Sequence, residues 1–240
     1  MLYKYIGNHD NEVTIRCLKY FLEDGTIRAS NPSSFNDPSE LKIDLDVNTT
    51  RSIAKKRHRK EGHNKSNFDQ WFDGLNKAKQ ASVEATRRQL MSRHGVICLT
   101  RNPDNYLMWS HYSASHTGFC IGFDDDFVGT IDNVALAMSV EYSEKVPVYN
   151  YFTDPDIELS KKIFFTKHKC WSYENEYRVI VDSQGIKKFN KSHIKEVVLG
   201  THAPRELELY ARTFLDTGIK IYKMKSPYNT YSLVKTEITS

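Results

Sequence analysis

Two glutamates, Glu174 and Glu176, stand one residue apart in the stretch WSYENEYRVIV, residues 171–181. The alternating apolar pattern that follows them predicts a strand beginning near Glu176. Alternate residues of a strand share a face, so we expect both carboxylates on one side of its entrance. Like charges this close raise the proton affinity of at least one carboxylate, unless a cation such as Arg178 compensates.

Two interpretations of this acidic pair remain open. In the first, a Glu–Arg pair at a surface contributes little to stability and carries no function. In the second, neighbouring aromatic rings partly desolvate the carboxylates, and the stretch is the catalytic edge of an enzyme. Three aromatic residues favour the second interpretation: Trp171, Tyr173 and Tyr177.

A second candidate cluster lies in YLMWSHYSASHTG, where we expect a helix over residues 106–115. On that helix His111 and Tyr112 share a face with Met108 and Ser115. One interpretation makes His111 a core histidine bonded to a backbone carbonyl. The other combines Trp109, His111 and Tyr112 into a ligand pocket that offers stacking and a titratable imidazole.

The stretch SFNDPSE, residues 34–40, predicts a rigid turn, because Asn and Asp before Pro bond to nearby backbone amides. The functional alternative is that Asp37 or Glu40 faces a cleft.

The elements that must position these residues follow from periodicity and turn signals. Helices are expected over 11–25, 156–171 and 202–216. Strands are expected over 2–7, 26–30, 41–47, 95–101, 119–124, 139–144, 177–182, 194–200 and 219–225, followed by a polar tail. Several strands follow one another directly, which favours an α+β fold with a twisted, mostly antiparallel or split sheet and flanking helices. The whole chain, 1–240, is interpreted as a single domain with an inserted helical segment at 50–94.

Charge is concentrated in that segment. Residues 51–93 hold twelve Lys and Arg against four Asp and Glu, whereas the chain of 240 residues carries +4 in total. A basic block of this kind attracts nucleic acid or another polyanion. The alternative is a solvated helical face.

Other features limit the class of protein. The four cysteines lack any CxxC pattern and are interpreted as reduced thiols, so no metal site is expected. No apolar run is long enough to cross a bilayer, and the first residues lack the layout of a signal peptide, so we expect a cytoplasmic protein without a membrane partner. Phosphate-binding glycine loops, HExxH and GxSxG are also absent from the sequence.

A set of blocks carries a resemblance to known sequences: LYKY, SNPSSFNDPSE, ICLTR, MWSHYSASHTGFCIGFD, WSYENEYRVIV and IKEVVLG. Together they resemble a widespread bacterial family of uncharacterised proteins, with hallmark FNDP, MWSHY and YExEYR blocks. The resemblance extends from Leu2 to Gly200.

More remotely, the order of these blocks is similar to that of ADP-ribosyltransferases. The resemblance implies an ADP-ribosyltransferase-like sheet with NAD bound as the substrate. It places Lys4 where the superfamily has Arg or His, Thr100 in the hydroxyl segment and Glu176 in the catalytic position, with Glu174 as a second carboxylate. The residues expected to bind NAD or a related nucleotide are Lys4, Tyr3, Tyr5, Thr100, Trp109, His111, Tyr112 and Arg178.

The function expected from this resemblance is that of an NAD-dependent transferase or NAD-cleaving effector, such as a toxin or an antiviral defence protein. Its acceptor would be a nucleic acid or a protein, and it would work with a cognate partner protein. Two alternatives stay open. One is a nuclease-like enzyme that uses the basic segment, and the other is a non-enzymatic small-ligand sensor or antitoxin.

Overall fold

The computed structural model describes residues 1–239, with the side chain of Asn76 left aside. Within this range the chain forms two compact units. Unit 1 comprises Met1–Asn31, His94–Val140 and the chain from Cys170 onward, and unit 2 comprises Pro32–Arg93 and Glu141–Lys169. The basic helices predicted as an insertion belong to unit 2, together with two further stretches of chain.

Unit 1 is built on a sheet that has eight strands in the described chain, in the order β14-β13-β12-β5-β1-β4-β10-β6. All neighbouring strands are antiparallel except β12 and β13, which are parallel. The strands are β1 (Leu2–Ile6), β4 (Gly95–Thr100), β5 (Phe119–Phe123), β6 (Val134–Ser139), β10 (Glu176–Val181), β12 (Ile194–Leu199), β13 (Lys220–Lys225) and β14 (Val234–Glu237). A separate ribbon pairs β2 (Thr26–Ala29) with β11 (Gly185–Lys188).

The sheet has two unequal halves that meet between β1 and β4. These two strands pair only at Tyr3 and Thr100, whereas β4 pairs with β10 over six positions and β1 pairs with β5 over five. The strands that carry Lys4 and Glu176, β1 and β10, are separated by β4 alone.

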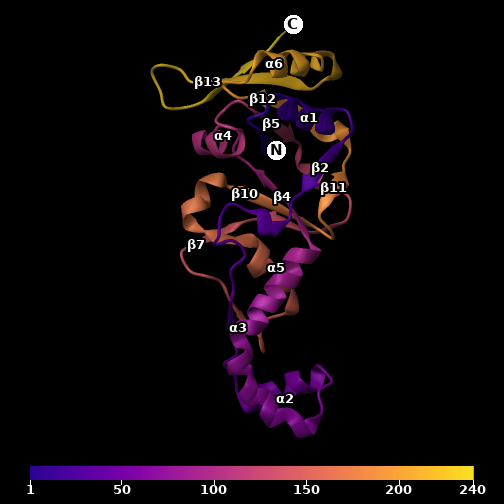
Figure 1. Ribbon diagram of the computed structural model, residues 1–240, viewed down its shortest axis with the longest axis vertical. Helices are drawn as coiled ribbons and strands as arrows, with labels where there is room; N and C mark the ends of the chain where they lie inside the picture. The colour runs from indigo at the N-terminus through magenta and orange to yellow at the C-terminus, as the bar shows by residue number, and fades with distance from the viewer. Residues whose placement is uncertain (240) are drawn as a thin grey trace. The chain divides into compact units, whose positions relative to one another are not determined.

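Helices cover both faces of this sheet (Figure 1). Alternate side chains of a strand point to opposite faces, and on β5 Phe119 and Phe123 join one buried cluster while Cys120 joins another. The first cluster includes residues of α1 (Asn11–Leu22) and α6 (Arg205–Arg212), and the second includes residues of α4 (Tyr106–Tyr112). Thus α1 and α6 pack on one face, and α4 packs on the other.

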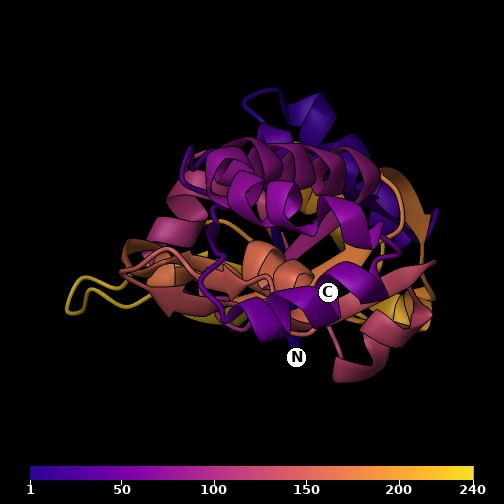
Figure 2. The same ribbon diagram turned by 90° about the horizontal axis from the view of Figure 1, so that it is seen from below.

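Unit 2 contains the helices α2 (Arg51–Lys60), α3 (Phe68–Arg93) and α5 (Asp156–Phe165). Two parallel ribbons accompany them, β3 (Asp44–Asp46) with β8 (Val148–Asn150), and β7 (Glu141–Ser143) with β9 (Thr166–His168). The ring of His58 in α2 packs on Phe68, the first residue of α3. The helices α2 and α3 lie against each other (Figures 1 and 2).

The structure confirms the predicted α+β class with a large, mostly antiparallel sheet and flanking helices. Several predicted elements were wrong in extent. The strand expected over 41–47 is limited to β3, the helix expected over 156–171 ends at Phe165, and the polar tail contains β14. Edge elements such as β14 depend on a partner strand, which local patterning does not reveal.

Candidate functional site

The two glutamates lie in different elements of unit 1. Glu174 ends a 3-10 helix, Lys169–Glu174, and Glu176 is the first residue of β10. Asn175 between them has a φ of 42°, in the left-handed region. This residue interrupts the extended backbone between the two glutamates. The strand alternation that predicted both carboxylates on one face therefore does not apply, and the two carboxylates have different surroundings.

Glu174 is 2% exposed and receives a hydrogen bond from α4. The hydroxyl of Tyr112 donates to its Oε1 over 2.6 Å. At the other end of the helix, Asn105 caps the first turn and donates from its side chain to the carbonyl of Tyr173 over 3.3 Å. These two hydrogen bonds hold the acidic stretch against α4.

Glu176 forms a buried ion pair with Arg178, two residues along the same strand. The guanidinium donates from Nε to Oε1 over 2.7 Å and from Nη2 to Oε2 over 2.9 Å. Arg178 is 0% exposed and Glu176 is 4% exposed. Two parallel bonds of this kind fix the orientation of the carboxylate.

Residues of β4 lie opposite this pair. Thr100 is in register with Glu176, and Cys98 is in register with Arg178. Burial raises the pKa of the Cys98 thiol, and the nearby Glu176 carboxylate raises it further. Cys98 was not predicted as a site residue from the sequence. Its neighbours Ile97 and Leu99 pack into the opposite face of the sheet, so the alternation of the strand was a signal that Cys98 lies on the other face.

Thr100 links the three strands. It is in register with Tyr3 of β1 on one side and with Glu176 of β10 on the other. Its hydroxyl donates to the carbonyl of Glu174 and accepts from the amide of Asn102 over 3.0 Å. The hydroxyl therefore holds the turn that carries the acidic pair.

Lys4 lies next to Tyr3 on β1, where β1 and β4 diverge. Its Nζ donates to the carbonyl of Cys98 over 3.1 Å. The ammonium thus binds a carbonyl of the neighbouring strand at a place where the ladder between these strands has ended.

Tyr3 and Tyr5 pack in the cluster under α4. The ring of Tyr3 lies 5.8 Å from the ammonium of Lys235, and burial followed by the Glu196 carboxylate raises the pKa of its hydroxyl. Tyr5 meets Trp109 edge to face at 5.0 Å and donates to the carbonyl of Asn102 over 2.8 Å. Both tyrosines are core residues of this face.

In the predicted Trp-His-Tyr cluster, His111 and Tyr112 have ring centroids 6.2 Å apart, whereas Trp109 faces the sheet. Trp109 is fully buried and donates to the carbonyl of Pro103 over 2.8 Å. His111 is exposed, and its Nδ1 lies 3.1 Å from the hydroxyl of Tyr173. The interpretation of His111 as a core histidine bonded to a backbone carbonyl is therefore wrong, because that face of α4 is turned away from the sheet.

In unit 2, the turn predicted at SFNDPSE is present. The Oδ1 of Asp37 accepts from the amide of Ser39 over 2.7 Å, as expected for a side chain that bonds to its own turn. Glu40 is buried and forms an ion pair of 3.1 Å with Lys167.

Part of the basic charge of unit 2 is neutralised locally. Arg51 pairs with Asp69, Lys79 with Asp44, and Arg57 with Glu61 and Asp156. Other cations of α2 are exposed and form no ion pair within the described chain: Lys55, Lys56, Arg59 and Lys60.

Among the described residues, His, Cys, Asp and Glu side chains do not gather in groups of three or more that could hold a metal ion. No helix in this part of the chain is long and apolar enough to cross a membrane.

Comparison with known proteins gives one family. Residues 108–179 match a family described as "Protein of unknown function (DUF2971)". The matched range is less than a third of the chain, and it begins in α4 and ends in β10. No curated protein and no solved structure matches the chain. The match supports the resemblance to an uncharacterised family. The matched range includes residues of α4 as well as the acidic pair.

Proposed function

We propose that unit 1 is an ADP-ribosyltransferase-like domain that cleaves NAD and transfers ADP-ribose to an acceptor. In this proposal Glu176 is the catalytic carboxylate and Glu174 assists it. Lys4 and Thr100 belong to the nucleotide-binding surface, in keeping with the resemblance of the LYKY, ICLTR and ENEYRVIV blocks to that superfamily.

The observation that supports the proposal most strongly is the order of three strands. The positions named by the resemblance lie on β1, β4 and β10, which are consecutive in the sheet. Thr100 stands in register with both Tyr3, the neighbour of Lys4, and Glu176. Sequence order alone does not require this, because residues 101–175 separate β4 from β10 in the chain.

The chemistry requires stabilisation of positive charge on a sugar. When the bond between nicotinamide and ribose breaks, nicotinamide leaves with the bonding electron pair and the ribose carbon acquires oxocarbenium character. A fixed carboxylate stabilises this charge, which is present only near the transition state. The paired guanidinium of Arg178 would hold the Glu176 carboxylate in one orientation. With water as acceptor, NAD and water give nicotinamide, ADP-ribose and a proton.

The role of Glu174 follows from its surroundings. Its Oε1 accepts from the Tyr112 hydroxyl, which fixes the carboxylate beside α4. In the proposal this carboxylate orients the incoming nucleophile and removes its proton.

The test is nicotinamide release from NAD by the purified protein, followed by chromatography. We expect Glu176→Gln to lower the rate by roughly 10²–10³-fold, the usual effect of removing one preorganised charge-stabilising group. Because Glu176 is also the partner of a buried arginine, Glu176→Asp is needed as a second variant. It keeps a negative charge beside Arg178 but withdraws the carboxylate by one methylene, and we expect a comparable loss.

The matched control is Glu196→Gln on β12. Glu196 is a buried carboxylate of the same sheet and forms an ion pair of 2.6 Å with Lys235. This variant should retain nicotinamide release. Wild-type rates in folded Glu176→Gln and Glu176→Asp would remove Glu176 from the catalytic role, and a wild-type protein that releases no nicotinamide would refute NAD cleavage.

A second candidate function is nucleic-acid processing, and the exposed cations of α2 support it. Binding that depends on such cations weakens steeply with salt, because counterions are released from the phosphates. The variant Lys56→Gln/Arg59→Gln/Lys60→Gln should then lower the affinity for a nucleic acid duplex and flatten its salt dependence. An unchanged affinity would argue against this role of α2.

A further inference from the structure

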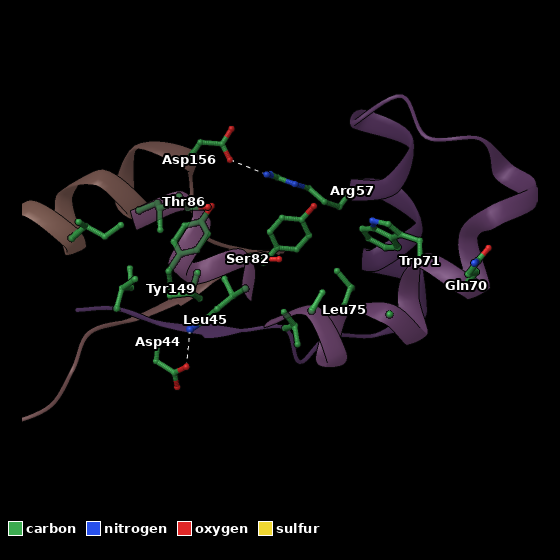
Figure 3. Close-up of a pocket in the computed structure, with 18 residues that line it drawn as sticks. Asp44, Leu45, Arg57, Gln70, Trp71, Leu75, Ser82, Thr86, Tyr149 and Asp156 are labelled. Atoms are coloured by element: carbon green, nitrogen blue, oxygen red, sulfur yellow. Dashed lines mark hydrogen bonds and ion pairs between the residues drawn. The ribbon is translucent and has the colours of Figure 1, made fainter. Parts of the chain in front are cut away.

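Unit 2 has an open cavity of about 540 Å³ between α3, β3, α5 and the chain that includes β8. This volume lies within the roughly 300–1,000 Å³ that is common for small-molecule sites. Figure 3 shows side chains from these elements directed toward one shared space. The cavity lies wholly within unit 2, so ligand binding there does not depend on NAD cleavage in unit 1.

One wall is a single face of α3. Trp71, Leu75, Ala78, Ser82 and Thr86 recur at spacings of three and four residues, so they line one side of the helix. Two of the lining residues of this helix, Gly74 and Ala78, have almost no side chain. They leave space that a leucine would occupy in an ordinary helix packed against a core.

The facing wall is apolar and aromatic. It is formed by Leu45 of β3, by Tyr149 and Tyr151 in and after β8, and by Ile163 of α5. Tyr149 and Ile163 are buried. The rings of Trp71 and Tyr151 have centroids 6.4 Å apart at an interplanar angle of 49°, so they form two sides of an aromatic corner.

The charged groups of the wall are already paired with one another or with neighbours. Arg57 donates to Asp156 over 3.0 Å and to Glu61 over 2.6 Å, and the first of these pairs borders the cavity in Figure 3. Asp44 pairs with Lys79 over 2.9 Å. A charged ligand would have to compete with these pairs, whereas an uncharged ligand leaves every pair intact.

Two hydroxyls of the wall are free to bind a ligand. The hydroxyls of Ser82 and Thr86, four residues apart on α3, form no hydrogen bond within the described chain. They lie beside apolar side chains, where a hydrogen bond to a ligand would fix its orientation.

We propose that unit 2 binds a small, uncharged, flat molecule that is mainly apolar and carries one or two hydrogen-bonding groups. Its rings pack against Trp71, Tyr149 and Tyr151, and its polar group faces Ser82 and Thr86. The paired charges exclude an anionic ligand, and the volume of the cavity limits the occupant to a small molecule.

The test uses N-phenyl-1-naphthylamine, an uncharged fluorescent dye with flat apolar rings, titrated into the full chain. We expect a saturable rise in fluorescence with one site per chain. The comparison dye is 8-anilinonaphthalene-1-sulfonate, which carries the same rings with an added sulfonate, and we expect it to bind at least about tenfold more weakly.

The location is tested by filling the cavity. Ala78→Trp places a large side chain in the space, and we expect at least about a tenfold loss of affinity for N-phenyl-1-naphthylamine. The matched control is Ala81→Trp, the same change three residues away at an exposed alanine that does not line the cavity. If Ala78→Trp fails to fold, Ser82→Phe provides a second filling variant at an exposed helical position.

Loss of dye binding in the filling variant, with binding retained in Ala81→Trp, supports the proposal. Equal binding in both variants would place the dye elsewhere and overturn it. Absence of saturable binding to the wild-type protein, or equal affinity for the sulfonated dye, would also overturn it.

Discussion

The guanidinium of Arg178 binds both carboxylate oxygens of Glu176 inside unit 1, with almost no exposure of either side chain. Moving two charges out of water is costly, and their mutual attraction offsets this cost only when the geometry is good and the other hydrogen-bonding groups are satisfied. Such a pair is weak evidence of stabilisation. Its clearest consequence is a carboxylate held in one orientation at the start of β10.

At this scale we predict that Arg178→Met destabilises the protein by roughly 3–5 kcal/mol, because Glu176 loses its cationic partner in a buried site. Replacing both residues, as in Glu176→Leu/Arg178→Met, should recover most of this loss. Urea unfolding of the single and double variants measures both effects. A single variant within about 0.5 kcal/mol of wild type would show that the pair does not hold the site together.

At the scale of elements, the turn after α4 has unusual backbone geometry. Ala114, Ser115 and His116 are consecutive non-glycine residues with φ between 49° and 68°. Each such residue costs about 1–2 kcal/mol in the left-handed conformation. The amide of Gly118 donates to the carbonyl of Ser113 over 2.8 Å, which closes the turn against the sheet.

Close approach of the backbone at this turn explains a glycine. A Cβ at Gly118 would lie 2.1 Å from the carbonyl oxygen of Ile6 on β1. The structure therefore uses Gly118 to bring the turn after α4 against the end of β1, the strand that carries Lys4.

We predict that Gly118→Ala destabilises the protein by about 1–3 kcal/mol, because the added methyl group must displace backbone atoms. The control is Gly129→Ala, where a Cβ would meet no atom within 4 Å. The urea midpoints of the two variants provide the measurement. Equal midpoints would contradict the close approach of these two segments.

At the scale of the whole molecule, carboxylates of both units are paired with cations. A hydrogen bond from Arg57 lowers the pKa of Asp156 in unit 2. In unit 1 a hydrogen bond from Lys223, opposed by burial and supported by Arg212, lowers the pKa of Glu208. A folded-state pKa below the unfolded value means that the folded state binds the proton less tightly.

The stabilisation from these groups is therefore complete above the unfolded pKa values of 3.8 for Asp and 4.5 for Glu, and it is lost as the pH falls through the folded values. We predict urea midpoints that decline below about pH 4.5. Glu208→Gln should reduce the difference between the midpoints at pH 7 and pH 3. An identical pH dependence in that variant would contradict the role of this carboxylate.

Histidine adds to this pH dependence with the same sign. Burial, together with the neighbouring His202, lowers the pKa of His116 below its usual 6.5. Its contribution to stability is thus complete above pH 6.5 and is lost as the pH falls through the folded value.

We predict that His116→Asn reduces the loss of stability between pH 7 and pH 5, since asparagine tolerates the left-handed conformation and does not titrate. Urea midpoints at these two pH values provide the measurement, and His9→Asn at an exposed position is the control. A pH dependence equal to that of wild type would rule out His116 as a source.

Local patterning was sufficient for those elements of this protein that bury one face along their own length. The strands at Leu2–Ile6, Gly95–Thr100 and Ile194–Leu199 and the helix beginning at Asn11 follow from the periodicity of their apolar residues.

Tertiary structure alone decided which strands are neighbours, and hence which residues share a site. The placement of β4 between β1 and β10, the bidentate Glu176–Arg178 pair and the cavity beside Trp71 depend on contacts between residues far apart in the chain. Periodicity reports which face of an element is buried, but not which surface covers it, because many partners satisfy the same apolar pattern. Strand order and cavities arise only when those faces are packed together.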